Sequence, residues 1–132
     1  MTEGCKILIV EDQMLIAMDL ERLIAGMDYQ VCGIARTRTE ALRLAEEHRP
    51  DLVVMDVRLA DGSDGIAAAR ELRQSFGIAA LLILTYGRAW IVALPTRLSS
   101  RASEYSKAVL AFVVSLGQIA VPMAGVYLGI SA

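Results

Sequence analysis

The sequence predicts an α/β fold in which helices wind over both faces of a parallel β-sheet. Short apolar runs that suit buried strands alternate with helix-like segments from Lys6 to Thr85. This alternation is typical of parallel strands joined by right-handed crossover helices. The chain has 132 residues, which suits a single domain, residues 1–132, with a sizeable core. We therefore expect one doubly wound sheet.

Four apolar runs predict the strands of this sheet. A continuous apolar run, rather than an alternating one, is expected for a strand buried on both faces. Residues 7–10 and 52–55 are the clearest runs of this kind. The predicted strands span residues 6–10, 30–35, 52–56 and 80–85.

Three segments between these strands predict helices. Residues 13–26 place their apolar side chains largely at helical spacing, and Gly26 can end that helix. Thr37 and Glu40 form a capping-box pattern that opens a helix through about residue 48, which Pro50 follows. The turn at residues 61–65 supplies the N-cap of a third helix over residues 66–76.

Charge is distributed unevenly along the chain. Residues 1–87 hold 14 acids and 9 bases, whereas residues 88–132 hold 1 acid and 4 bases. The net charge of −2 and the lack of a strong basic face give no case for nucleic-acid binding. Cys5 and Cys32 lack metal-ligand spacing, which favours two thiols in a reduced compartment. Since no secretory signal opens the sequence, we expect a cytoplasmic protein.

Three acids follow two of the predicted strands. Glu11 and Asp12 come directly after the first strand, and Asp56 ends the third. Ligand sites of parallel α/β sheets form beyond the carboxyl ends of the strands, so these carboxylates are expected to share one pocket. Such a pocket repels itself unless a hard cation occupies it, and Mg²⁺ prefers oxygen ligands. The alternative is that the acids are solvated or cap helices, as Asp12 could cap residues 13–26.

The chain resembles a response-regulator receiver domain of two-component signalling, closely over residues 5–87. The residues that carry this resemblance are Ile7-Leu8-Ile9-Val10-Glu11-Asp12, the stretch from Pro50 to Leu59, and Asp61-Gly62-Ser63-Asp64-Gly65. The resemblance implies a five-stranded parallel sheet of the flavodoxin-like (CheY-like) order 2-1-3-4-5. It also implies a signalling protein rather than an enzyme.

The resemblance also implies roles for individual residues. Asp56 matches the phosphoacceptor, a carboxylate nucleophile that takes a phosphoryl group from a phosphohistidine. Glu11 and Asp12 match the residues that hold Mg²⁺, together with Asp56 and the main-chain carbonyl of Arg58. Thr85 matches the hydroxyl residue that hydrogen-bonds the phosphoryl group. The implied partner is a sensor histidine kinase or a phosphotransfer protein.

The chain departs from the receiver pattern after Gly87. A receiver continues with a helix, a fifth strand, and a lysine followed by proline, but residues 88–95 show no amphipathic period and end on Pro95. Lys107 lies at about the right distance from Thr85 to be the phosphate-binding lysine, yet Ala108 follows it. Its alternative role is a solvated flank of the apolar segment that comes next.

Residues 108–132 carry no charge and leave three interpretations open. They can complete the sheet, with a strand at residues 109–114 and an apolar last helix that buries itself in a homodimer. They can form a membrane anchor, because one helix of about 20 residues spans a bilayer and Gly125-x-x-x-Gly129 resembles a helix-packing motif. They can also be a divergent terminus that packs poorly.

The leading functional hypothesis is a switch that works through protein–protein contacts when Asp56 is phosphorylated. One alternative is a module for interaction or dimerisation that is not phosphorylated and uses the apolar, or membrane-associated, tail. A second is a Mg²⁺-dependent phosphohydrolase with an Asp nucleophile. Those enzymes usually show Asp-x-Asp after the first strand, whereas here Arg58 stands two residues after Asp56.

Overall fold

The structure is a computed structural model that describes residues 5–59, 62, 64–86, 89–95 and 126–130. Side chains are described through Ile83, and the later strands by their backbone alone. Lys107 and the strand expected at residues 109–114 therefore lie outside the described residues.

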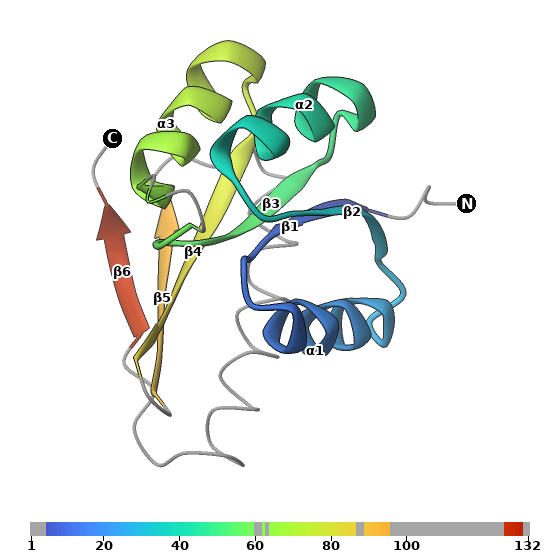
Figure 1. The fold of residues 1–132 in the computed structure, drawn as a ribbon, viewed down its shortest axis with the longest axis vertical. Coiled ribbons are helices and arrows are strands. Elements are labelled where there is room, and N and C mark those ends of the chain that lie inside the picture. Colours follow the sequence, from blue (N-terminus) through green and yellow to red (C-terminus); the bar gives the residue numbers. More distant parts are fainter. Residues whose placement is uncertain (1–4, 60–61, 63, 87–88, 96–125, 131–132) are drawn as a thin grey trace.

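Six strands form one sheet in the order β2-β1-β3-β4-β5-β6 (Figure 1). The first four strands are parallel to one another, which confirms the predicted doubly wound sheet and its order 2-1-3-4. The strands are β1 (Lys6–Val10), β2 (Gln30–Ala35), β3 (Leu52–Asp56), β4 (Ala79–Tyr86), β5 (Ala89–Pro95) and β6 (Val126–Ile130).

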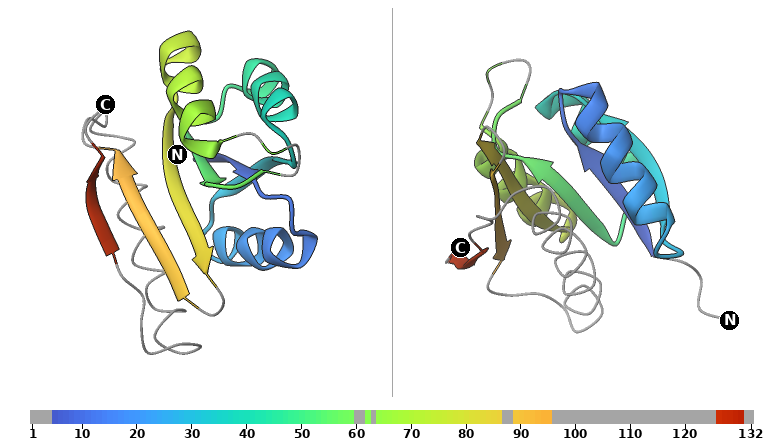
Figure 2. Two further views of the ribbon diagram at one scale, coloured as in Figure 1. Left: turned by 60° about the vertical axis from the view of Figure 1, so that its left-hand side comes forward. Right: turned by 90° about the horizontal axis from the view of Figure 1, so that it is seen from below.

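Three helices cover the two faces of the parallel part of the sheet. Helix α1 (Met14–Ala25) lies on one face, and α2 (Arg38–His48) and α3 (Gly65–Phe76) lie on the other (Figures 1 and 2). All three bounds agree with the predicted helices to within a residue. Among the described residues, no helix is long and apolar enough to cross a membrane.

Alternate residues of β1 pack into two different apolar cores, one on each face of the sheet. Ile7 and Ile9 of β1 pack in the core under α1, whereas Leu8 and Val10 pack in the core under α2 and α3. All four side chains are fully buried, and burying each contributes about 1.5–3 kcal/mol. This two-sided burial explains why β1 and β3 are continuous apolar runs in the sequence.

The helix ends follow the predicted signals. The Thr37 hydroxyl accepts a hydrogen bond from the Glu40 N–H at 3.2 Å, and the Glu40 carboxylate accepts one from the Arg36 N–H at 3.3 Å. Helix α2 ends at His48, and its C-cap residue Arg49 has a φ of 48°, in the left-handed region, just before Pro50. Gly26 follows the last residue of α1 and donates its N–H to the Arg22 carbonyl.

The sheet departs from the expected parallel arrangement at β5. This strand pairs with β4 in the antiparallel direction, and β6 pairs with β5 in parallel. Only two residues separate β4 from β5, and a parallel neighbour would need a crossover of a dozen residues or more. The fifth strand of this sheet is thus antiparallel rather than parallel, and the strand expected at residues 109–114 lies outside the described residues. The strand β6 also contradicts a single helix over residues 108–132.

Candidate metal and phosphoacceptor site

The site forms where β1 and β3 end. These neighbouring parallel strands are in register, with Val10 opposite Met55, so Glu11 and Asp56 emerge at the same edge of the sheet. The Glu11 N–H donates to the Ala35 carbonyl at 2.9 Å, which continues the β1–β2 ladder by one residue. The strand pairing thus places the acids that follow β1 beside the acid that ends β3.

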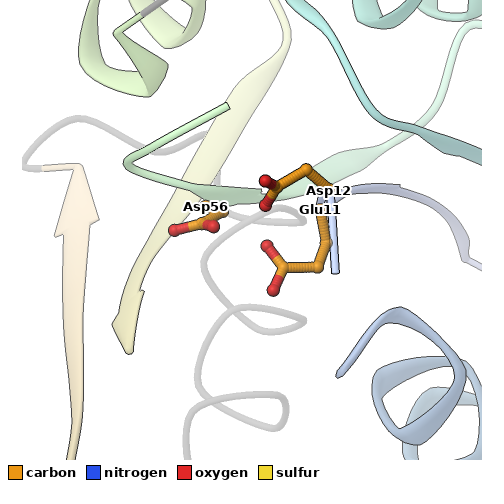
Figure 3. Close-up of side chains that lie close together, drawn as sticks. All are labelled: Glu11, Asp12 and Asp56. Carbon is orange, nitrogen blue, oxygen red and sulfur yellow. The ribbon is translucent and has the colours of Figure 1, made fainter. Parts of the chain in front are cut away.

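Three carboxylates come together at this edge (Figure 3). Glu11, Asp12 and Asp56 each offer one oxygen, and these oxygens all lie within 4.8 Å of one another. At such distances ionised carboxylates repel, and a cation among them removes that repulsion. The predicted acid cluster is therefore present in the fold.

Glu11 is an acidic residue buried in the protein interior. Its side chain is 3% exposed, and neither carboxylate oxygen has a hydrogen-bond partner among the described residues. Burial, reinforced by the neighbouring Asp56 and Asp12 carboxyls, raises the pKa of Glu11 to about 9. A small cavity of about 10 Å³ adjoins Glu11 and Asp56, and apolar side chains such as Ile16 and Ile83 line the rest of it. The site therefore favours either a proton or a cation at Glu11.

Asp56 is held by the backbone that follows it. The Arg58 N–H donates to the Asp56 Oδ1 at 3.3 Å. The Val57 N–H donates to the Ile83 carbonyl of β4 at 3.1 Å, which extends the β3–β4 pairing past Asp56. The first contact holds one carboxylate oxygen of Asp56, and the second holds the backbone beside it.

Asp12 does not cap α1. The N-cap residue of α1 is Gln13, and no side-chain capping hydrogen bond forms there among the described residues. The capping explanation for Asp12 is therefore wrong, and its carboxylate faces the acid cluster instead. In contrast, the Asp64 Oδ1 accepts a hydrogen bond from the Ile66 N–H at 2.9 Å, so the predicted cap of α3 is confirmed.

The sequence predicts Gly65 only as one residue of a turn, whereas in the structure it packs directly against the backbone of Asp56. Gly65 is the first residue of α3, and its N–H donates to the Val57 carbonyl at 2.7 Å. The signal was present, since glycine is a poor helix former and here begins a helix directly after an Asp cap.

The other two expected site residues are only partly covered. Thr85 lies near the end of β4, and its backbone is paired with Trp90 of β5. Lys107 lies outside the described residues, as stated above, so both assignments stay predictions.

The donor set suits a hard divalent cation. Three carboxylates supply only oxygen ligands, and the two unpaired oxygens of the buried Glu11 show that the site lacks a positive partner among the described residues. Glu11, Asp12 and Asp56 are therefore the residues that could hold Mg²⁺, and Arg58, whose carbonyl is the other expected ligand, comes two residues after Asp56.

Comparison with known proteins supports the fold and the family. A family model described as the response regulator receiver domain matches residues 7–104. The phyllosphere-induced regulator PhyR of Methylorubrum extorquens AM1 is 49% identical over 82 residues, which are 61% of this chain and 31% of that protein. The chain thus spans about a third of that curated relative's length.

Two solved structures are similar as well. The receiver (REC) domain of Erythrobacter litoralis PhyR, solved by NMR, has a TM-score of 0.62 at 27% identity and covers 84% of this chain and 91% of that one. PhyR of Bartonella quintana, an anti-anti-sigma factor crystallised with the anti-sigma factor NepR, has a TM-score of 0.60 at 33% identity. That match covers 81% of this chain and 48% of that one. This chain belongs to the response regulator receiver domain family of signalling proteins.

Proposed function

We propose that this protein is a phosphorylation-dependent switch whose phosphoacceptor is Asp56. The observation that carries the proposal is the gathering of Glu11, Asp12 and Asp56 at the ends of β1 and β3, where the buried Glu11 carboxylate has no hydrogen-bond partner among the described residues. Such a cluster suits a Mg²⁺-dependent phosphoryl transfer, because the cation neutralises charge on the transferring group and orients it.

In the proposed reaction, a carboxylate oxygen of Asp56 attacks the phosphorus of a phosphohistidine on a sensor kinase or phosphotransfer protein. The O–P bond forms as the P–N bond breaks, and the leaving imidazole nitrogen keeps the electron pair. Glu11 and Asp12 would hold Mg²⁺, together with Asp56 and the Arg58 carbonyl. We also propose that Thr85 and Lys107 bind the phosphoryl oxygens once the acyl phosphate has formed.

Intact-mass analysis after incubation with acetyl phosphate and Mg²⁺ tests this proposal. We expect one phosphoryl adduct on the wild type and none on Asp56→Asn. The matched control is Asp51→Asn, which changes an acid next to the opposite end of β3, where its carboxylate accepts a hydrogen bond from the Lys6 N–H. An adduct on Asp56→Asn would refute the assignment. Repeated release of phosphate from an ester such as p-nitrophenyl phosphate would instead favour a phosphohydrolase.

We further propose that the switched partner is a protein of the anti-sigma-factor class. The support is the likeness to PhyR of Bartonella quintana, which is complexed with NepR in its solved structure. The test is the affinity of the chain for purified Bartonella NepR before and after treatment with acetyl phosphate. Phosphorylation should change this affinity, and equal affinities, or no binding in either state, would contradict this partner.

A further inference from the structure

Gly65 occupies a position where no side chain fits. A Cβ built on Gly65 would lie 2.1 Å from the Asp56 carbonyl oxygen, 2.9 Å from the Val57 Cα and 3.0 Å from the Asp56 carbonyl carbon. All three atoms belong to the backbone, so no flexible side chain could move aside to make room. The first turn of α3 therefore rests directly on the backbone of the proposed phosphoacceptor.

Gly65 differs in this respect from the other glycines of the described part of the chain. Gly62 and Gly77 have positive φ angles of 75° and 67°, and a Cβ on either would meet nothing within 4 Å. Glycine is needed at those two positions for their backbone conformation. Gly65 is not one of the described glycines with a positive φ. The reason for glycine at this position is therefore its close contact with the Asp56 backbone.

Backbone hydrogen bonds and a β-bridge connect Gly65 and its neighbour to the proposed metal ligands Asp56 and Arg58. Its N–H donates to the Val57 carbonyl at 2.7 Å, and Asp64, the residue before it, pairs with Arg58 in an antiparallel bridge. Arg58 in turn donates its N–H to the Asp56 carboxylate. A shift of α3 away from Asp56 would therefore displace Arg58 and Asp56 relative to the acids that follow β1.

We propose that Gly65 is a positioning residue of the metal and phosphoacceptor site. Its missing side chain lets α3 hold the backbone of residues 56–58 in the geometry that cation binding and phosphorylation need. The inference rests on the proposed function above and extends it to a residue outside the acid cluster. Groups that orient metal ligands typically affect metal affinity by about 10–100-fold, and a displacement of about 1 Å can cost about 100-fold in rate.

The test compares Gly65→Ala with Gly77→Ala in the full chain. Both substitutions add one methyl group to an end of α3, but Gly77 lies at the end far from Asp56. Mg²⁺ affinity by calorimetry and the rate of labelling by acetyl phosphate are measured at a temperature where circular dichroism shows both variants folded. We expect Gly65→Ala to weaken Mg²⁺ binding about 10–100-fold and to slow labelling. Gly77→Ala should bind Mg²⁺ like the wild type.

If Gly65→Ala does not fold, a pair of variants at Asp64 tests the same contact. Asp64→Asn keeps an oxygen that can cap α3, whereas Asp64→Ala removes the cap and loosens the start of the helix. We expect weaker Mg²⁺ binding for Asp64→Ala than for Asp64→Asn, and equal affinities would overturn the inference.

The outcomes separate this inference from the proposed function. If the wild type binds Mg²⁺ and is labelled, and Gly65→Ala does both equally well, only the role of Gly65 is wrong. If the wild type itself neither binds Mg²⁺ nor is labelled, both proposals are wrong.

Discussion

The ends of β1 and β3 lie side by side, but the acids that follow them differ in their hydrogen bonding. After β1, in the part of the chain that the structure describes, both oxygens of the buried Glu11 lack a hydrogen-bond partner, and the Gln13 side chain does not cap α1. After β3, Asp56 accepts a hydrogen bond from Arg58, and Asp64 caps α3. An unpaired buried carboxylate is costly unless a cation or a proton joins it. The β1 end therefore supplies charge for a ligand, whereas the β3 end holds the proposed nucleophile in place.

The pH dependence of stability is the largest effect expected from this difference. The folded state keeps a proton on Glu11 up to its raised pKa of about 9, whereas the unfolded chain loses it near 4.5. Between these values the folded state binds more protons, so without Mg²⁺ the free energy of unfolding should fall as pH rises. The slope from this group is at most about 1.4 kcal/mol per pH unit.

Denaturant unfolding in EDTA at pH 5 to 8 measures this slope. Glu11→Gln cannot titrate, so its stability should depend less on pH than that of the wild type. The same pH dependence in both proteins would show that Glu11 is not the group responsible.

Cation binding should stabilise the wild type by a smaller amount. At 100 times the dissociation constant, a ligand that binds only the folded state adds about 2.7 kcal/mol to the free energy of unfolding. We expect Mg²⁺ to raise the melting temperature of the wild type, and to raise it much less for Asp12→Asn. Asp19→Asn, which changes an exposed acid of α1 paired with Arg22, is the matched control. An equal Mg²⁺ response in all three proteins would place the cation elsewhere.

The smallest expected change in stability comes from the different capping of α1 and α3. Asp64→Ala removes the cap of α3 and should lower the free energy of unfolding by about 1 kcal/mol. Gln13→Ser supplies a hydroxyl at the uncapped N-cap position of α1, whose backbone is already extended, and should stabilise the protein by up to about 1 kcal/mol. Chemical denaturation of both variants measures these changes. A loss of stability for Gln13→Ser would show that the start of α1 cannot accept a cap.

The parallel core was predictable because its signals are local. Strands β1 and β3 are buried on both faces and so appear as continuous apolar runs, and Thr37 marks the start of α2 by its capping pattern. The acid cluster was predictable for a related reason: neighbouring parallel strands bring their carboxyl ends to one edge of the sheet.

Other features depend on contacts that sequence patterns do not encode. The apolar segment at β5 shows no alternation that would reveal its direction, and its antiparallel pairing follows from the two-residue connection to β4. The burial of Glu11 and the contact of Gly65 with Asp56 both arise from how α1, α3 and the sheet pack together.

Tandem mass spectrometry of peptides can locate the phosphoryl group after reaction with acetyl phosphate, and this measurement tests directly whether Asp56 is the phosphoacceptor. We expect a single modified residue, Asp56, and a modification that requires Mg²⁺ and is lost when EDTA is present. A phosphoryl group on any other residue, or labelling of Asp56 that is unaffected by EDTA, would contradict the division of roles between the two strand ends.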